Sequence, residues 1–367
     1  MRVVIAGGGT AGHVFPAVAL ADRLSDDTDV RVEFIGSSAG QEATLVPDAG
    51  YPFHGVAAAP LRRELSISSA KAPFVAIGSV RACAPFVRDA DVVVGMGGYA
   101  SVPAALAARR ARVPVVLHEQ NAVPGLANRL LARIARSVGV SFADAAARFP
   151  VSVPVAVTGN PVRRQVLAVA STPEAIAVQA WDALDLDPAR ATVVVFGGSQ
   201  GALHVDQAIA GALEGLSSRG DLQLLVLTGR EKADVVARAA ERPMDLRVRV
   251  LPYLERMELA YAVADLAVAR AGATSIAEMT VCGLPSILIP YPHATEDHQT
   301  ANARELVGAG AAELYADADL SSDGLARRIL DLMDDDTRRA AMAARASAWS
   351  KPDADERLAA LVREAVR

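Results

Sequence analysis

Four glycine-rich stretches have the composition of loops that bind phosphate groups. Two lie in the first half of the chain, at residues 7–13 (GGGTAGH) and 95–101 (GMGGYAS), and two lie in the second half, at residues 197–202 (GGSQGA) and 270–278 (RAGATSIAE). Each follows an apolar run and precedes a segment with helical periodicity. Glycine permits a turn with positive φ, and the start of the next helix offers N–H donors and a partial positive charge. Together the four stretches predict a ligand that carries phosphate groups.

The first glycine stretch also fits the pattern of a dinucleotide site. Gly7, Gly9 and Gly12 satisfy G-x-G-x-x-G, and Glu33 follows about twenty residues later, where a ribose-binding carboxylate is expected. However, Glu33 lies inside a strand-like run, whereas the ribose carboxylate stands at the end of its strand. His13, directly after the third glycine, has no role in holding a pyrophosphate that needs only backbone donors. These features disfavour a nicotinamide or flavin site.

His13 is the first candidate for proton transfer. An imidazole has an ordinary pKa of about 6.5 and can act as a general base near neutral pH. His118 and Glu119, which begin the polar run HEQN at the end of an apolar run, are the alternatives for this role. Four hydrogen-bonding side chains in succession suit a polyhydroxylated ligand such as a sugar. A packed or capping histidine at position 13, and a capped turn after residue 119, are the competing structural interpretations.

Two further stretches have side chains suited to a sugar nucleotide. Arg163, in GNPVRR, lies at an expected hinge, where a guanidinium can clamp a phosphate, although an exposed arginine is an equally ordinary interpretation. Ala273, Thr274 and Ser275 open a predicted helix, and Glu278 follows on its first turns. Small residues there suit a diphosphate, and the carboxylate suits the hydroxyls of a ribose. Favourable interaction with the helix dipole is the competing explanation for Glu278.

Metal-binding patterns are weak in this sequence. The segment 291–303 (YPHATEDHQTANA) contains two histidines, but neither H-E-x-x-H nor a Cys/His ligand set is present. Three D-x-D triplets, at residues 89–91, 185–187 and 317–319, fall in segments expected to be exposed. We therefore expect neither a metal nor another cofactor.

The elements that position these loops follow from the alternation of β-branched runs with longer Ala- and Leu-rich segments. Residues 192–213 (TVVVFGGSQGALHVDQAIAGAL) repeat the order of apolar run, glycine turn and helix seen in residues 3–24 (VVIAGGGTAGHVFPAVALADRL). The pattern predicts an α/β fold with two Rossmann-like, doubly wound parallel-sheet domains that face a cleft. Ligands of such sheets bind at the carboxyl ends of the strands. The predicted strands are residues 3–6, 30–36, 91–97, 113–119, 155–159, 222–229, 247–253, 266–272 and 285–291.

The expected domain limits are residues 1–160 and 161–345, with a last helix at about 346–367 that packs back on the first domain. The chain has 367 residues, of which 52% are hydrophobic, so that two cores can be buried. A net charge of −5 disfavours a general nucleic-acid binder. Cys83 and Cys282 are expected to be buried, reduced thiols. Neither a signal peptide nor an apolar run of about 18–20 residues is present, so an intracellular protein is expected.

The motifs, taken together and in order, resemble those of the MurG family of peptidoglycan glycosyltransferases over nearly the whole chain. The stretches that match are GGGTAGHVFPA, GMGGYAS, HEQNAVPGLANR, GNPVR, GGSQGA, RAGATSIAE and PHATEDHQTANA. The resemblance implies a GT-B fold and transfer of N-acetylglucosamine from UDP-N-acetylglucosamine to the muramoyl 4-hydroxyl of lipid I, which gives lipid II. It implies one displacement with inversion and no metal.

The resemblance also implies roles for individual residues. His13 matches the proposed base, and Gly97, Gly98 and Tyr99 belong to an acceptor and diphosphate loop. The small differences from some members are Ala11 in place of Gly and His298 in place of Gln. The residues that match donor-binding positions are Thr10, Ala11, Gly12, Asn121, Arg163, Ser199, Leu254 (through its backbone, to uracil), Ala273, Thr274, Ser275, Ile276, Ala277, Glu278 and Gln299 (to the transferred sugar).

Lipid I is anchored in the inner leaflet, so the resemblance implies a peripheral protein on the cytoplasmic face of the cell membrane. The segment 61–88 offers a surface for anionic lipids, because five basic residues against Glu64 give it a net charge of +4. An amphipathic crossover helix is the alternative interpretation. The basic residues are Arg62, Arg63, Lys71, Arg81 and Arg88, and the apolar ones are Phe74, Val75, Ile77, Val80, Phe86 and Val87.

Two rival functions remain open. A UDP-N-acetylglucosamine epimerase of the same architecture needs no lipid acceptor, and a nucleotide-sensing module binds without turnover. The HEQN run and His13 disfavour both.

Overall fold

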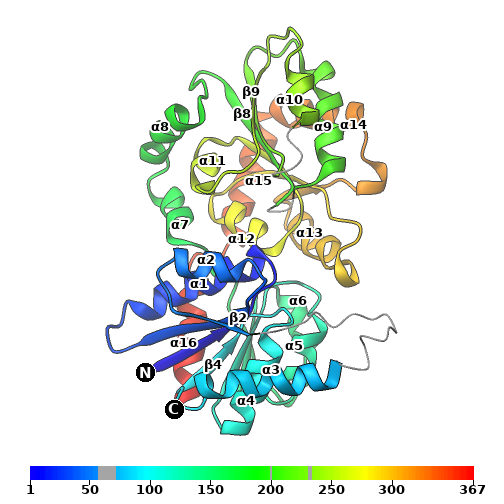
Figure 1. Cartoon of the computed structure of the whole chain (residues 1–367). Coiled ribbons are helices and arrows are strands. Elements are labelled where there is room, and N and C mark those ends of the chain that lie inside the picture. The colour runs from blue at the N-terminus through cyan, green and yellow to red at the C-terminus, as the bar shows by residue number, and fades with distance from the viewer. Residues whose placement is uncertain (57–71, 199–200, 230–233) are drawn as a thin grey trace. The chain divides into compact units, whose positions relative to one another are not determined.

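The computed structural model describes residues 1–56, 72–198, 201–229 and 234–367, with the side chains of residues 72–77 left out. The chain forms two compact units: residues 1–163 with 351–367, and residues 164–350 (Figure 1). The sequence places these limits at 160 and 345. Helix α15 (Asp336–Trp349) belongs to the second unit, and the segment that returns to the first unit forms α16 (Ala354–Val366).

The first unit contains a parallel sheet with the strand order β3-β2-β1-β4-β5-β6-β7. Neighbouring strands end together, since Ala6 pairs with both Ile35 and Gly95, so their carboxyl ends share one edge. The elements are β1 (Arg2–Ala6), α1 (Ala11–Ser25), β2 (Arg31–Ser37), α2 (Glu42–Asp48), β3 (Phe53–Val56), α3 (Ala72–Val87), β4 (Val92–Gly95), α4 (Ser101–Ala111), β5 (Val115–Glu119), α5 (Leu126–Leu131), β6 (Ser137–Val140), α6 (Ala143–Ala146), β7 (Val155–Val157) and α16.

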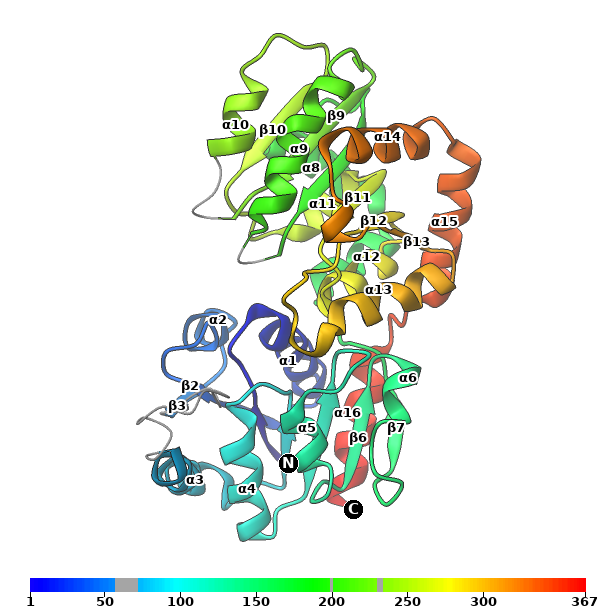
Figure 2. The ribbon, with the colours of Figure 1, turned by 90° about the vertical axis from the view of Figure 1, so that its right-hand side faces the viewer.

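Alternating apolar side chains on β1 account for the helices on both faces of this sheet. Val3 and Ile5 lie in one core with residues of α1 and α16, and Val4 and Ala6 lie in another with residues of α3, α4 and α5. Figures 1 and 2 show these two helix layers. A strand buried on both faces needs apolar residues at every position, which is why β1 has the uninterrupted sequence VVIA.

The second unit contains a parallel sheet with the order β10-β9-β8-β11-β12-β13. One face of it packs against α9 and α14 (Figure 2). The elements are α7 (Arg164–Ser171), α8 (Pro173–Leu184), β8 (Ala191–Phe196), α9 (Leu203–Leu216), β9 (Leu222–Leu227), α10 (Asp234–Ala240), β10 (Arg247–Leu251), α11 (Met257–Val263), β11 (Leu266–Ala269), α12 (Ala273–Val281), β12 (Ser286–Leu288), α13 (His298–Gly308), β13 (Ala312–Leu314), α14 (Ser322–Met333) and α15, with short 3-10 turns at Thr295–Asp297 and Asp317–Asp319.

The predicted α/β class with two doubly wound parallel sheets is confirmed. Among the described helices, none has both the length and the apolar character that a membrane crossing requires. Burial raises the pKa of the Cys83 thiol to about 11, and burial followed by the nearby Glu278 carboxylate raises that of Cys282. Both thiols are therefore protonated near neutral pH, although Cys282 is only half-buried.

Candidate active site

The first two glycine stretches meet at the carboxyl edge of the first sheet. Gly98 has a φ of +74° and lies so close to Gly8 that an added Cβ would stand 2.3 Å from the Gly8 carbonyl oxygen. A Cβ on Gly9 would stand 3.3 Å from the ring of Tyr99. The approach requires glycine at position 98, both for its backbone conformation and for space. The fold thus brings together two loops that are far apart in the sequence.

His13 lies in the first turn of α1, beside the second loop. Its Nδ1 is 3.1 Å from Thr10 Oγ1. A Cβ on Gly97, where φ is +85°, would be 3.3 Å from His13 Nε2 and 3.4 Å from Gln120 Oε1. A side chain at position 97 would therefore crowd the imidazole, and glycine avoids this contact. The half-buried His13 is at the point where the first loop, the second loop and the HEQN run converge.

Gln120 joins the ends of β4 and β5. Its side chain is buried, and its Nε2 donates to the Met96 carbonyl oxygen at 2.8 Å and lies 3.2 Å from His118 Nδ1. Its Oε1 is buried without a hydrogen-bond partner among the residues that the structure describes. Gln120 was not among the predicted site residues, although it lies within the HEQN run that drew attention to its neighbours.

The structure argues against His118 as a base. Its side chain is fully buried, its Nε2 donates to the Gly159 carbonyl oxygen at 2.9 Å, and its Nδ1 receives the Gln120 amide. Burial lowers the pKa of His118 to about 4, although the bond to Gly159 opposes the shift. Both ring nitrogens are thus committed, and the imidazole is neutral near pH 7. His118 instead ties β5 to the segment that leads out of the first unit.

The carboxylate of Glu119 is likewise used inside the protein. It is 3% exposed and accepts hydrogen bonds from the Asn121 amide nitrogens, the Gly125 backbone and Asn128 Nδ2 at 2.9–3.4 Å. Burial raises the pKa of Glu119, and these bonds only partly offset the shift. The geometry argues against Glu119 as a base and shows that it orients the turn carrying Asn121.

The first loop differs from the expectation that its backbone N–H groups are open to a ligand. Glu42 Oε2 accepts the Gly9 N–H at 2.8 Å, and Gln41 Oε1 accepts the Ala11 N–H at 2.8 Å. Sequence reasoning missed both side chains. The available signal was their place directly after a glycine-flanked strand end, GSSAGQE (36–42), at the edge where the first loop begins.

Arg163 lies at the end of the first segment of unit 1 and packs on α1. Its guanidinium carbon is 4.2 Å from the centre of the Phe15 ring, two residues after His13. Stacking of this kind holds a guanidinium in one orientation. The structure therefore places Arg163 beside the helix that carries His13.

In the second unit, α12 begins at Ala273 after the N-cap Gly272, and its first turn contains no acidic residue. Glu278 is 4% exposed, and its Oε2 accepts the Tyr261 hydroxyl at 3.0 Å. Of the other predicted residues on this helix, Ala273 and Ile276 are buried, whereas Thr274, Ser275 and Ala277 are half-buried. The predicted diphosphate and ribose residues thus occupy consecutive turns at the start of one helix.

Three buried or half-buried side chains connect the neighbouring strand ends of this unit. Arg270 Nη1 donates to the carbonyl oxygens of Ile289 and Pro290 at 3.2 and 3.0 Å and pairs with Asp317. Asn302 Nδ2 donates to the Ala271 carbonyl oxygen at 3.1 Å. Gln299 Oε1 accepts the Tyr291 N–H at 2.9 Å. These bonds fix the loop before α12 against the loops after β12 and β13.

Asp317 is the acid that completes this connection. Burial raises its pKa, but hydrogen bonds from His204, with the two atoms 2.8 Å apart, and from Arg270 outweigh burial, so the pKa is lowered overall. Asp317 therefore stays ionised and balances the buried Arg270. Leu254 follows the carboxyl end of β10 and is half-buried. Ser199 lies outside the described residues.

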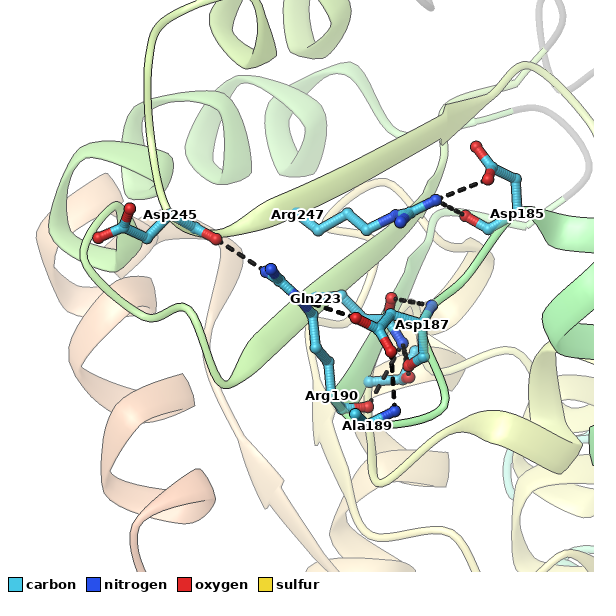
Figure 3. Close-up of polar contacts among 8 residues, drawn as sticks. Asp185, Asp187, Ala189, Arg190, Gln223, Asp245 and Arg247 are labelled. Atoms are coloured by element: carbon cyan, nitrogen blue, oxygen red, sulfur yellow. Dashed lines mark hydrogen bonds and ion pairs between the residues drawn. The ribbon is translucent and has the colours of Figure 1, made fainter.

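The other D-x-D triplets also have internal partners. Arg247 Nη2 binds the carbonyl oxygen and the Oδ1 of Asp185, and Asp187 accepts the Ala189 N–H and pairs with Arg190 (Figure 3). This cluster adjoins the amino ends of β9 and β10, away from the glycine loops. Asp91 Oδ2 accepts the Arg2 N–H at 2.7 Å. Across the described part of the chain, no group of three His, Cys, Asp or Glu residues is arranged to hold a metal.

The segment expected to face a membrane is only partly described. Residues 61–71 and the side chains of 72–77 lie outside the described part. Arg81 and Arg88 are exposed, as expected. Val80 and Val87 are buried in the core of the first unit, and Phe86 stacks on His54 with ring centres 4.0 Å apart. The expectation that Val80 and Val87 contact lipid is therefore wrong, because both pack against the sheet.

Comparisons with known proteins support the same architecture. Residues 3–140 match the glycosyltransferase family 28 N-terminal domain, and residues 192–358 match the glycosyltransferase family 28 C-terminal domain. The crystal structure of MurG from Acinetobacter baumannii superposes with a TM-score of 0.78 at 30% identity and covers 99% of each chain. The chain belongs to the MurG family of glycosyltransferases.

Relatives from several bacteria align with this chain over nearly their full length. A protein of Acidothermus cellulolyticus, named UDP-N-acetylglucosamine--N-acetylmuramyl-(pentapeptide) pyrophosphoryl-undecaprenol N-acetylglucosamine transferase, is 42% identical over 100% of this chain and 98% of its own. One of the same name from Lactiplantibacillus plantarum is 38% identical over 98% of each. A UDP-GlcNAc 2-epimerase from Neisseria meningitidis shares the fold, with a TM-score of 0.70, but only 13% of the sequence. The chain is therefore a hexosyltransferase, and its likeness to the epimerase is one of fold.

Proposed function

We propose that this protein transfers N-acetylglucosamine from UDP-N-acetylglucosamine to the muramoyl 4-hydroxyl of lipid I, giving lipid II for peptidoglycan synthesis. The observation that carries the proposal is the cluster at the carboxyl edge of the first sheet, where His13 lies between Thr10 and the closely packed Gly97. Full-length identity of 42% to a relative named for this reaction supports the choice of substrates. Loss of lipid II synthesis would then disturb cell shape and division.

His13 is the proposed base. In the tautomer with its proton on Nδ1, which lies 3.1 Å from Thr10 Oγ1, the lone pair is on Nε2 and can accept the proton of the attacking hydroxyl. The Nε2 atom would lie 3.3 Å from a Cβ added at Gly97, so any side chain at position 97 would crowd this edge of the imidazole. Gly97, Gly98 and Tyr99 would then border the acceptor, and Thr10, Ala11 and Gly12 would contact the donor UDP-N-acetylglucosamine. General base catalysis of this kind contributes about 10²–10⁴-fold to the rate.

The second unit is the proposed donor domain. The start of α12 carries a partial positive charge of about half a unit, and no acid in its first turn opposes a diphosphate there. Ala273, Thr274 and Ser275 would hold the diphosphate, Glu278 the ribose, and Gln299 the transferred sugar. Leu254 would contact uracil through its backbone, while Asn121, Arg163, Ser199, Ile276 and Ala277 complete the proposed donor set. Fixed N–H donors would stabilise the leaving diphosphate without a metal.

Peripheral contact with the cytoplasmic face of the membrane belongs to the same proposal, because lipid I is anchored there. The exposed Arg81, within α3, and Arg88, directly after it, suit anionic headgroups. Reversing both charges should weaken co-sedimentation with anionic vesicles. Binding that is unchanged in the reversed variant would exclude this end of α3 as the contact.

The deciding experiment measures UDP release with and without a soluble lipid I analogue. A transferase releases UDP only when the acceptor is present, and the product contains one more N-acetylhexosamine by mass spectrometry. An epimerase changes the sugar without acceptor, and a binding module releases nothing. Either of those results would contradict the proposal. Turnover that persists with a chelator would agree with the metal-free mechanism, and loss of turnover would contradict it.

A further inference from the structure

Glu42 occupies an unusual place beside the first glycine loop. Its side chain is 1% exposed. Its Oε1 accepts the Ser37 N–H, and its Oε2 accepts the Gly9 N–H, each at 2.8 Å. The carboxylate thus bridges the end of β2 and the turn between β1 and α1. Glycine loops commonly bind a phosphate through backbone N–H groups, and here such groups bind a buried carboxylate of the protein.

Three glycines make the space that this carboxylate fills. An added Cβ would stand 2.1 Å from the carboxylate at Gly8, 2.5 Å from Glu42 Cγ at Gly36, and 2.2 Å from the carboxylate at Gly40. Gly40 has an ordinary φ, and its three nearest atoms all belong to Glu42. A side chain at Gly40 would therefore first meet the Glu42 carboxylate. The loop is built around the side chain of α2.

Gln41 adds a second contact from the same helix start. Its Oε1 accepts the Ala11 N–H at 2.8 Å, at the first residue of α1. Gly9 and Ala11 flank Thr10, whose hydroxyl lies 3.1 Å from His13 Nδ1. Two internal acceptors thus fix the backbone on either side of the residue that orients the imidazole.

We propose that Glu42 is a positioning residue of the transferase: its carboxylate takes the place of a phosphate at the first loop and holds Thr10 and His13 in the reacting geometry. The inference rests on the proposed base role of His13. It also assigns the Gly9 and Ala11 N–H groups to the protein, so the substrate diphosphates are bound by other donors. Displacement of a reacting group by about 1 Å lowers a rate by about 10²-fold.

The first test is chemical rescue of Glu42→Ala. We expect kcat to fall by about 10–100-fold and the KM for UDP-N-acetylglucosamine to stay within about twofold, since the proposed donor residues that hold UDP lie mainly in the second unit. Formate, a carboxylate without a side chain, should restore part of kcat in a saturable way. The controls are wild-type protein and Glu33→Ala, which removes a partly buried carboxylate elsewhere in the first unit. Neither should respond to formate. Circular dichroism and thermal unfolding confirm that each variant is folded.

The second test changes the neighbour and keeps the carboxylate. Gly40→Ala should push the Glu42 carboxylate away from the Ser37 and Gly9 N–H groups and lower kcat by itself. Because the obstruction is Glu42, adding Gly40→Ala to Glu42→Ala should cost little more. If a single variant is too unstable for the activity assay, the coupling between Gly40→Ala and Glu42→Ala can be measured in the same double-mutant cycle through the free energy of unfolding.

These outcomes separate the inference from the proposed function. An active wild type with a folded Glu42→Ala variant whose kcat is unchanged would overturn the inference and leave the transferase intact. The inference would also be overturned if Glu42→Ala and Glu33→Ala lost kcat equally, in proportion to the fraction of each protein that is folded, and if formate restored neither. If Glu42→Ala does not fold, additive effects of Gly40→Ala and Glu42→Gln on kcat would overturn it. A wild type without acceptor-dependent UDP release would contradict the proposed function itself.

Discussion

The starts of α1 and α12 look alike in sequence and differ in structure. Both follow a strand and a glycine-containing turn, and both begin with an alanine. At α1, side chains of Gln41 and Glu42 accept the Ala11 and Gly9 N–H groups. At α12, the first turn carries no acid, and the nearest carboxylate on the helix, Glu278, is bound to Tyr261.

The difference separates two uses of one structural unit. A helix start whose positive end already faces an internal carboxylate has less to offer a diphosphate, because the two anions compete for the same donors and repel each other. Its backbone is fixed by internal hydrogen bonds, and at α1 this fixed backbone positions His13. The first turn of α12 carries no acid of its own, so a diphosphate there would meet no like charge from that turn. We therefore propose that the first unit supplies the general base and that the second unit binds the diphosphate.

The largest effect should come from removing the His13 imidazole. His13→Ala should lower kcat by about 10²–10⁴-fold with little change in UDP affinity, because the proposed base acts in the transition state and the proposed UDP site lies in the second unit. Acceptor-dependent UDP release under saturating substrates measures the loss. His54→Ala, which removes a half-buried histidine paired with Glu33 in the same unit, is the matched control. Near-normal turnover in His13→Ala would contradict the proposal that the first unit supplies the general base through His13.

The second prediction concerns stability in acid. The folded pKa of His118 is about 4, below the unfolded value, so the unfolded chain binds more protons between these values. Unfolding free energy should therefore fall as pH decreases, and His118 should account for a loss of about 2 kcal/mol between pH 7 and pH 5. Urea unfolding of wild type and His118→Gln at both pH values measures this difference.

Glutamine keeps an Nε2 donor for the Gly159 carbonyl oxygen but does not titrate. The variant should therefore start less stable and lose less on acidification. Equal losses in both proteins would mean that His118 is protonated in the folded state, and it would then return as a candidate for proton transfer.

The third prediction adds an internal anion to the second unit. Ser275→Asp puts a carboxylate in the first turn of α12 and should weaken UDP binding by about tenfold through repulsion of the diphosphate. The same change should leave the folded state equally or slightly more stable, because an acid near a helix start is favourable. Calorimetry with UDP and thermal unfolding measure both quantities. Ser275→Asn, which has the same shape without charge, is the control. Unchanged affinity in Ser275→Asp would contradict diphosphate binding at this helix.

The smallest effect should come from the partner of the proposed ribose carboxylate. Tyr261→Phe removes the hydroxyl that holds Glu278 and should raise the KM for UDP-N-acetylglucosamine by about fivefold with kcat nearly unchanged. Tyr315→Phe removes another buried tyrosine hydroxyl of the same unit, one that accepts the Ser321 N–H, and should leave KM as it is. A fall in kcat alone would show that Tyr261 acts on the chemical step and does not orient the ribose carboxylate.

Much of the fold could be predicted from local patterns. The apolar runs became β1, β2, β4, β5 and β7 to β12, usually shorter than predicted because the glycines and polar residues at their ends turn the chain. Strands β3, β6 and β13 were not predicted. Gly55 and Gly139 interrupt the apolar pattern of β3 and β6, and β13 has only three residues. Such strands gain most of their stability from their neighbours in the sheet, which a local pattern does not show.

The candidate site was predicted in part. The positions of the glycine loops and of His13 follow from the sequence, because glycine turns after apolar runs mark the carboxyl ends of parallel strands. Whether a polar side chain faces a ligand or the protein does not follow. His118, Glu119 and Glu42 show this, since all three are buried and hydrogen-bonded within the protein.

The sequence by itself determined the parallel α/β sheets, the glycine turns that precede helices, and the family. These depend on periodicity and on short motifs, which act over a few residues. Only the tertiary structure decided that the Gly9 and Ala11 N–H groups already have acceptors, and that His118 is held without charge. The physical reason is that both the desolvation of a charge and the pairing of a buried donor depend on atoms contributed by distant parts of the chain.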